Sequence, residues 1–185
     1  MEYPLERTWT LWETLRGRVD QRHEIYRNNT KALGEFSTLH EFWQYWHYID
    51  HSDPHYLFSK IFTEEAASVE AVCIFEQGIE PAWEDPVNVE GCDISVRKKF
   101  DPQKLKEFWN KLVFSIIGET LPFSEEVAGC RIVDKVPFYK VELWWKTDLS
   151  DESNTEKRLK VEQALLGVFD FKIESKELRV SNHKQ

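Results

Sequence analysis

The segment from Asp101 to Gly118 constrains the fold most, because its two ends and its internal pattern all predict one helix. Asp101 precedes Pro102, and this pair is typical of a helix start, while Gly118 is typical of a helix end. Between them, apolar side chains recur at helical spacing and form one stripe: Leu105, Phe108, Trp109, Leu112, Val113 and Ile116. A helix with such a stripe has to bury one face against another element.

Segments typical of β-strands lie on both sides of this helix and follow one another closely. They cover residues 8–15, 69–75, 94–98, 130–136 and 139–146, with two short runs near Phe171 and Leu178. Two more helices are predicted at 39–49 and 154–166, whereas 50–68 carries weak signals and reads as a long connection. Adjoining strands favour an antiparallel sheet with helices on one face, which is the α+β class.

Length and charge narrow the classes of function. With 185 residues the chain suits a single domain covering 1–185, and its net charge of -9 argues against a protein that coats nucleic acid. Eight tryptophans and twelve phenylalanines are many for this length, and aromatic rings are used to stack bases. A protein that binds one base and a short phosphate tail would reconcile the two facts; an aromatic-rich core is the alternative. Since the N-terminus lacks the pattern of a signal peptide, we expect a cytoplasmic protein that can also be nuclear, with no membrane partner.

A tryptophan stands within 77–85, where glycine and proline exclude regular structure. Trp83 is followed by Glu84 and Asp85. Large aromatic side chains are usually buried, so a tryptophan in such a loop calls for a reason. It either covers the hydrophobic core or offers a ring for ligand stacking, and the sequence leaves both possibilities open.

Alternation along 139–146 assigns its side chains to opposite faces of a strand. One face carries Tyr139, Val141, Leu143 and Trp145; the other carries Lys140, Glu142, Trp144 and Lys146. On the preceding strand, Arg131 and Lys135 share a face. If the two strands pair, Trp144 lies among cations, and the alternative is a solvated face with one aromatic residue.

Two further features are weaker. Phe114 lies about half a turn from the apolar stripe of its helix, with Ile117 beside the stripe, and an outward apolar patch can receive a partner. Histidines at 47, 51 and 55 with nearby aspartates do not supply a closed ligand set, so we predict no metal site. No catalytic motif is present, and we expect a protein without cofactors that is not an enzyme.

Four motifs occur in one order between residues 4 and 119. They are Pro4-Leu5-x-x-x-x-Trp9-x-Leu11-Trp12, Phe36-Ser37-Thr38-Leu39-His40-Glu41-Phe42-Trp43, Gly78-Ile79-Glu80-Pro81-x-Trp83-Glu84-Asp85-x-x-Asn88-x-x-Gly91, and Phe108-Trp109 with Ile117-Gly118-Glu119. This series resembles the opening strand, first helix, signature loop and second helix of the eukaryotic translation initiation factor 4E family. The resemblance extends to about Trp145 and implies a curved antiparallel sheet of about eight strands, with three helices on its convex face.

The resemblance also implies a ligand, the 7-methylguanosine cap of messenger RNA, held in the concave face. Methylated guanine is cationic and is attracted to aromatic faces, and the two stacking rings of the family match Trp83 and Tyr26. Glu84 matches the residue that accepts hydrogen bonds from the guanine edge. Trp144 matches the tryptophan that lines the methyl group.

The phosphate side shows departures from the family. Lys135 and Lys140 match its phosphate-binding cations, and we add Arg131 because it shares a face with Lys135. However, Asp93 stands where the family has an arginine and Pro137 where it often has a lysine. We therefore expect the phosphates to contribute little to the affinity for the cap.

A second surface of the family binds a helical peptide of a scaffold initiation factor of the 4G type, or of 4E-binding repressors. Its residues match Pro4, Leu39, Trp43, Phe114, Ile117 and Gly118. Asn110 and Lys111 replace a leucine and a glutamate there. The expected function is to bind the cap and recruit the messenger to the scaffold for translation initiation. The alternatives are a cap-binding repressor or storage variant with altered scaffold binding, and an interaction domain that has lost cap binding.

Overall fold

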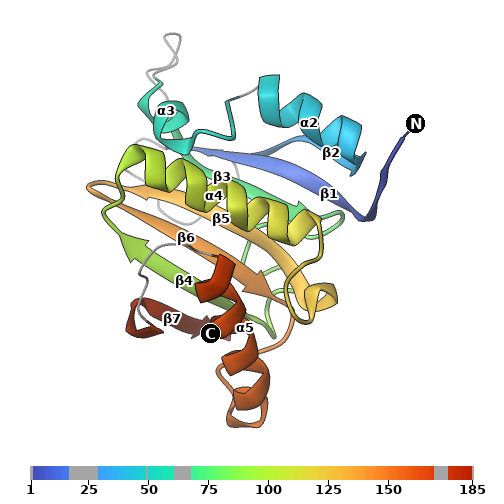
Figure 1. Ribbon diagram of the computed structural model, residues 1–185, viewed down its shortest axis with the longest axis vertical. Coiled ribbons are helices and arrows are strands. Elements are labelled where there is room, and N and C mark those ends of the chain that lie inside the picture. Colours follow the sequence, from blue (N-terminus) through green and yellow to red (C-terminus); the bar gives the residue numbers. More distant parts are fainter. Residues whose placement is uncertain (1, 17–28, 49, 61–67, 169–174, 185) are drawn as a thin grey trace.

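One curved antiparallel sheet organises the chain. The computed structural model describes residues 2–16, 29–48, 50–60, 68–168 and 175–184. Within these residues seven strands pair in the order β2-β1-β3-β5-β6-β4-β7 (Figure 1). The strands are β1 (Pro4–Leu15), β2 (Thr30–Thr38), β3 (Val69–Glu76), β4 (Cys92–Lys98), β5 (Val127–Lys135), β6 (Phe138–Trp145) and β7 (Leu178–Asn182).

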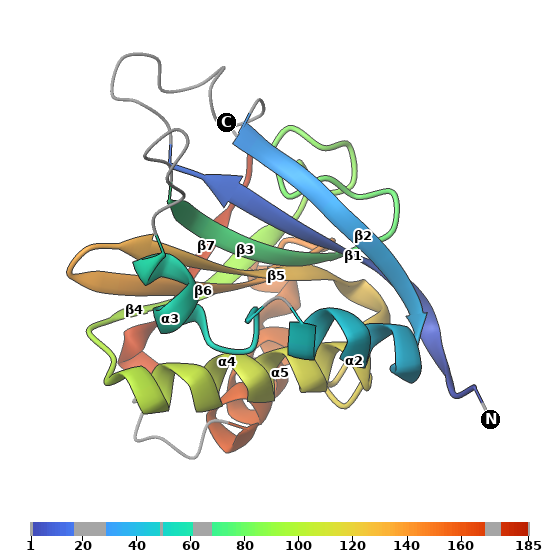
Figure 2. The same cartoon turned by 90° about the horizontal axis from the view of Figure 1, so that it is seen from above.

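Four helices of the described residues lie on one side of this sheet (Figure 2). They are α2 (Leu39–Tyr48), α3 (Pro54–Ser59), α4 (Pro102–Ile117) and α5 (Thr155–Val168). The view from above shows them below the strands, while the loop after β3 rises on the other side (Figure 2). We call the two sides the helix-covered face and the open face. The α+β class with helices on one face is confirmed. None of the described helices is both long and apolar enough to cross a membrane.

The ends of α4 follow the expected chemistry. The Asp101 carboxylate accepts hydrogen bonds from the backbone N–H groups of Gln103 and Lys104, at 3.1 and 3.4 Å. Gly118 ends the helix, and its N–H donates to the Phe114 carbonyl. The predicted stripe is buried against the sheet: Leu105, Phe108, Trp109, Leu112, Val113 and Ile116.

Strand β6 separates two clusters of buried side chains. Val141, Leu143 and Trp145 enter the main core between the sheet and the helices. Trp144 instead packs on the open face in a small second cluster with Cys73, Phe75, Ile79 and Ala128. Strands β5 and β6 pair, which is the condition under which Trp144 lies among cations, with Arg131 opposite Glu142 and Lys135 opposite Phe138.

Two elements of the structure are not predicted from the sequence. Strand β2 is not predicted by the sequence, because only Phe36 of its nine residues is buried and no alternation marks it. Helix α3 lies within the segment 50–68 that reads as a connection, where the Asp53 carboxylate caps the N–H of Tyr56. The described residues hold seven strands and four α-helices, close to the count of about eight strands and three helices that the resemblance implies. The run expected near Phe171 lies outside the described residues.

Candidate functional site

The loop that carries Trp83 is held in shape by two buried polar side chains. The Asp85 carboxylate accepts hydrogen bonds from the N–H groups of Glu80 and Val87, both at 2.9 Å. The Asn88 amide donates to the carbonyls of Glu80 and Ala82, at 2.8 and 2.9 Å. These bonds close the loop upon itself, so its backbone has a defined shape without being a helix or a strand.

Two glycines permit this path. Gly78 has φ 85°, in the left-handed region that disfavours other residues. At Gly91 a Cβ atom would lie 2.0 Å from the Trp145 carbonyl oxygen, so only glycine lets the loop rejoin the sheet this closely. The loop is thus fixed to the end of β6 that bears Trp144 and Trp145.

Trp83 does not cover the hydrophobic core. Its side chain is 47% exposed, so the stacking interpretation is favoured over the core-covering one. The neighbouring Glu84 is also exposed. Within the described part of the chain, its carboxylate has no hydrogen-bond or ion-pair partner. An accessible ring and an accessible carboxylate therefore follow one another on an ordered loop.

Trp144 lies fully buried at the base of this site. Its ring packs edge-on against Phe75, with centroids 5.3 Å apart, and its Nε1 donates to Oε2 of Glu142 at 3.1 Å. The Arg131 guanidinium lies 5.0 Å from the centre of the ring. Trp144 is therefore a buried residue of the open face rather than a solvated surface residue, and its contact with the methyl group stays a prediction.

Glu142 connects the cations of the open face. Its carboxylate is 1% exposed and accepts hydrogen bonds from Arg131 Nε and, at 2.6 Å, from Lys140 Nζ. Burial alone would raise the pKa of Glu142, but the two cations outweigh it and lower the pKa to about 2. Asp93 lies 3.6 Å from Lys140 Nζ and adds a second carboxylate. The positive charge expected here is thus balanced by two acids.

His183 lies between the two tryptophans, and the family resemblance also connects this residue with the loop that borders the ligand. Its ring centre lies 4.4 Å from that of Trp144 and 6.4 Å from that of Trp83, with an angle of 22° between the latter rings. Its Nδ1–H donates to the Asn88 carbonyl at 2.9 Å, and Nε2 lies 3.6 Å from Asp93. The pairing of β7 with β4 brings residue 183 to this place.

Three other residues predicted to contact the ligand are not all found beside Trp83 in the described structure. Lys135 is exposed at the end of β5 and pairs with Glu70 at 3.3 Å. Arg131 is 9% exposed and directed at Glu142 and Trp144. Tyr26, the predicted second stacking ring, lies outside the described residues. The phosphate and stacking roles of these three residues stay predictions.

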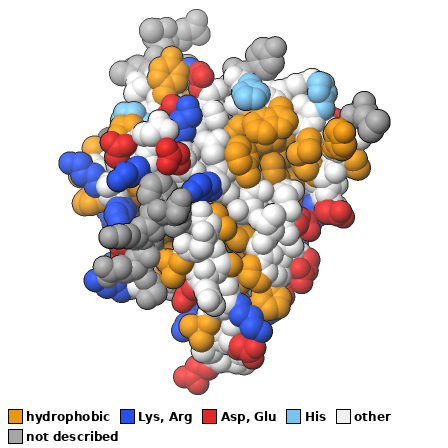
Figure 3. Space-filling model, viewed as in Figure 1, with side chains coloured by type: hydrophobic (Ala, Val, Ile, Leu, Met, Phe, Trp, Pro, Cys, Tyr) orange, Lys and Arg blue, Asp and Glu red, His pale blue; other side chains and the backbone are white. Residues whose placement is uncertain are grey.

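A second candidate surface lies on the helix-covered face. Trp43 of α2 and Phe114 of α4 are 40% and 39% exposed, and their rings lie 5.6 Å apart in an edge-to-face arrangement. Leu39 is 38% exposed, and His47 stacks on Trp43. Figure 3 shows apolar side chains gathered in this region with histidines at the edge. Phe114 is therefore a member of an apolar patch, which we define as Leu39, Trp43 and Phe114.

Other residues expected at this surface divide into exposed and buried ones. Pro4 and Gly118 are exposed, but Ile117 is 5% exposed and belongs to the core. Asn110 turns inward: its Oδ1 accepts from Trp46 Nε1, and its Nδ2 donates to the Ser52 carbonyl, both at 2.7 Å. Its replacement of a leucine therefore joins α2 to α4 rather than altering the patch.

The histidines considered for a metal site have separate partners. His47 stacks on Trp43, His51 is buried and bonds to Glu13 at 2.7 Å, and His55 bonds to the Tyr139 hydroxyl at 2.9 Å. Among the described residues no three metal-binding side chains converge on one point.

Comparisons of sequence agree with the motifs. The family model described as Eukaryotic initiation factor 4E matches residues 4–185. Eukaryotic translation initiation factor 4E-2 of Schizosaccharomyces pombe is 30% identical over 169 residues, which cover 91% of this chain and 63% of that protein. Eukaryotic translation initiation factor NCBP of rice is 30% identical over 127 residues, covering 69% of this chain and 50% of that protein. The chain thus spans 50% to 63% of the length of these two relatives.

Comparisons of structure agree with the fold. eIF4E-3 of Ascaris suum, solved with the m2,2,7G cap, has a TM-score of 0.77 and 25% identity; the match covers 100% of this chain and 93% of that one. eIF4E-3 of C. elegans, solved with the 4E-binding protein Mextli and a cap analog, has a TM-score of 0.73 and 25% identity, with coverage of 99% and 94%.

Proposed function

Because this chain belongs to the eukaryotic initiation factor 4E family, we propose that it binds the 7-methylguanosine cap of messenger RNA in the cytoplasm and recruits the messenger to a scaffold initiation factor. The observation that carries this proposal is the half-exposed ring of Trp83, followed by the accessible carboxylate of Glu84, on a loop fixed by Asp85 and Asn88. Two structural neighbours were solved with caps or cap analogs, which supports the same ligand class.

The chemistry of the methylated base suits this pair of residues. Methylation at N7 gives the guanine a positive charge, which is attracted to the electron-rich face of the Trp83 indole. The Glu84 carboxylate can accept hydrogen bonds from N1–H and from the exocyclic amine of the same base. Adenine lacks that pair of donors, so its binding would leave the carboxylate unsatisfied.

In this proposal the phosphates contribute less to the affinity than the methylated base does. Arg131 and Lys140 already contact Glu142, and Lys140 also lies near Asp93. A phosphate that approaches them competes with two carboxylates, so its net attraction is small. Recognition then depends on the base, and the affinity for the nucleotide falls only slightly with added salt.

The apolar patch of Leu39, Trp43 and Phe114 is the proposed contact for the scaffold or for a 4E-binding protein. A helical peptide can lay apolar anchors against such a patch. The C. elegans neighbour was solved with the 4E-binding protein Mextli, which supports a partner of this kind. A repressor or storage role remains the alternative, because Lys111 stands where the family pattern has an acidic residue that suits a basic peptide.

Tryptophan fluorescence tests the proposal with two matched variants. We expect 7-methyl-GTP to quench the fluorescence of the full chain at much lower concentration than GTP does. Trp83→Ala should remove this difference, whereas Trp43→Ala removes a similarly exposed indole from the other face and should preserve it. Equal, weak responses of the unaltered protein to both nucleotides would overturn the cap proposal and favour an interaction domain without cap binding.

The same two tryptophan variants should have the opposite effects on binding of the partner peptide. A Tyr-x-x-x-x-Leu-apolar helical peptide from a 4G-type scaffold should be retained by Trp83→Ala and lost by Trp43→Ala in a pull-down. Lys111→Glu separates scaffold recruitment from the repressor or storage role. A protein that recruits the scaffold binds the peptide with Lys111 in place, whereas a protein with altered scaffold binding should bind it only after Lys111→Glu.

A further inference from the structure

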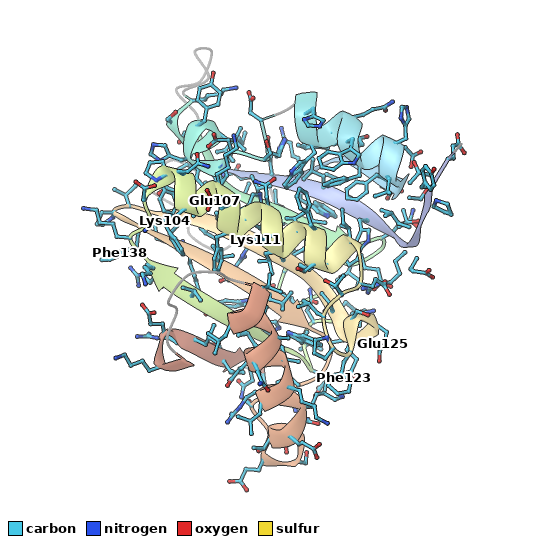
Figure 4. The ribbon with its side chains drawn as sticks, viewed as in Figure 1. Lys104, Glu107, Lys111, Phe123, Glu125 and Phe138 are labelled. Carbon is cyan, nitrogen blue, oxygen red and sulfur yellow. The ribbon has the colours of Figure 1, made fainter. Side chains whose placement is uncertain are left out.

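A second aromatic ring lies farther along the open face, at the start of β6. Phe138 is the first residue of that strand and lies at the edge of the view in Figure 4. It is 39% exposed. Strand alternation places Phe138 on the same face as Lys140, Glu142 and Trp144. Trp144 lies six positions along the strand from Phe138, which corresponds to about 20 Å.

Phe138 has a cation beside it. Arg97 stands opposite Lys140 in the pairing of β4 with β6, so its side chain also lies on the open face. The Arg97 guanidinium is 5.4 Å from the centre of the Phe138 ring. An exposed ring next to a planar cation is a surface on which a nucleic-acid base can stack.

The cations near Phe138 differ from those near Trp144. Arg131 and Lys140 are bound to Glu142, whereas Arg97 and Arg179 have no ion pair with any carboxylate in the part of the chain that the structure describes. Arg179 lies opposite Ser95 on β7 and shares the open face with Arg97. Arg97 therefore carries uncompensated positive charge beside Phe138, and Arg179 carries it on β7, two strands from β6 and level with Glu142.

We propose that Phe138, Arg97 and Arg179 bind the first nucleotide that follows the cap, with its base on the Phe138 ring and its phosphate at the arginines. This inference rests on the proposed function, since the cap guanine would occupy the Trp83 end of the same face. The linking phosphates would then run along β6 past Lys140. Stacking of an unpaired base on an aromatic ring, with nearby cations for the backbone, is the usual way in which proteins hold single-stranded RNA.

Two ligands separate this subsite from the cap site. One is 7-methyl-GTP, which ends at the phosphates; the other is a capped five-nucleotide RNA. The unaltered protein should bind the capped RNA about tenfold more tightly than 7-methyl-GTP, in the range expected for one stacked base. Phe138→Ala should abolish this preference and leave the affinity for 7-methyl-GTP unchanged, while Phe138→Tyr should retain it.

A control variant and a modified RNA complete the test. Val136→Ala removes an exposed apolar side chain from the same turn without removing a ring, and it should retain the tenfold preference. A capped RNA without a base at its first position should bind no more tightly than 7-methyl-GTP. Arg97→Gln and Arg179→Gln should each lower the salt dependence of capped-RNA binding by about one unit of slope, again without an effect on 7-methyl-GTP.

The outcomes distinguish this subsite from the proposed function. If 7-methyl-GTP and GTP bind alike, both proposals are overturned. If 7-methyl-GTP is preferred but Phe138→Ala retains the tighter binding of capped RNA, or the base-free RNA binds as tightly as the intact one, only the subsite is overturned.

Discussion

The guanidinium of Arg131 donates a hydrogen bond to the carboxylate of Glu142 across the β5–β6 pair, at a point where both side chains are buried. Lys140 contacts the same carboxylate from within β6. A buried acid with two cationic partners strongly favours its ionised form. Glu142 therefore links β5 to β6 on the open face. It also neutralises part of the positive charge that a ligand would meet there.

Stability should depend on pH through Glu142. Its pKa is lowered from 4.5 to about 2 in the folded protein, so its ionised form stabilises the fold. That stabilisation is complete above pH 4.5 and is lost as the pH falls toward 2, because the unfolded state binds the proton first. We expect Glu142→Gln to lower the free energy of unfolding by about 3 kcal/mol at pH 7 and by much less at pH 3.

Chemical denaturation at the two pH values measures this effect. Glu156→Gln is a suitable control, since its carboxylate pairs with Lys160 on the exposed side of α5 and should change stability little at either pH. An equal loss of stability for Glu142→Gln at pH 7 and pH 3 would contradict the role of its ionisation.

Discrimination of the base should depend on Glu84. Replacement by glutamine keeps the shape of the side chain but removes the charge and one acceptor. We expect Glu84→Gln to weaken binding of 7-methyl-GTP by about 2 kcal/mol, as for the loss of a charge-assisted hydrogen bond. Thermal unfolding should be unchanged, because the side chain is exposed. Glu90→Gln alters another exposed acid of the same loop and should bind 7-methyl-GTP normally; equal effects of the two variants would point to general charge rather than to a specific contact.

The position of Trp83 should depend on Asn88. Asn88 is fully buried and its amide donates to two carbonyls of the loop. Asn88→Ala leaves both carbonyls without that donor, so the loop should lose its shape and the affinity for 7-methyl-GTP should fall at least tenfold. Hydrogen exchange would locate the change: amides within 77–91 should lose protection, while those of β5 and β6 keep theirs. Loss of protection throughout the sheet would instead show that Asn88 stabilises the whole fold.

The attachment of α2 to α4 should depend on Asn110. Its Oδ1 accepts from Trp46 Nε1, and Trp46 is 1% exposed. Asn110→Leu restores the residue type of the family pattern but leaves a buried N–H and the Ser52 carbonyl without a partner. We expect a loss of about 2 kcal/mol in the free energy of unfolding, and tighter binding of a 4G-type peptide is not expected. A stable variant with improved peptide binding would show that the leucine acts at the patch itself.

Local chemistry explains which parts of the fold were predictable. Helix α4 has its own start and end signals at Asp101 and Gly118, and the alternation along β6 is strict, so both were predicted with their buried faces. Strand β2 gives no such signal because its side chains are mostly exposed, and its place depends on long-range pairing with β1.

The same distinction holds for the candidate site. Trp83 and Trp144 break a local pattern and could be identified, whereas His183 reaches them only through the order of the strands. Ile117 shows a limit of the resemblance. The family pattern assigns it to the partner surface, but its side chain is 5% exposed and belongs to the main core, as its place beside the buried stripe of α4 indicates.

Strand β6 carries two adjacent indoles on opposite sides of the sheet, Trp144 and Trp145. A slip of the strand by one residue would exchange them, and because the rings are alike, hydrophobic burial alone would oppose this misfolding only weakly. Lys140 and Glu142 disfavour the slipped register, because it would place both charged side chains in the apolar core beneath the helices. The residues that prepare the open face for a ligand thus also make the folded register unique.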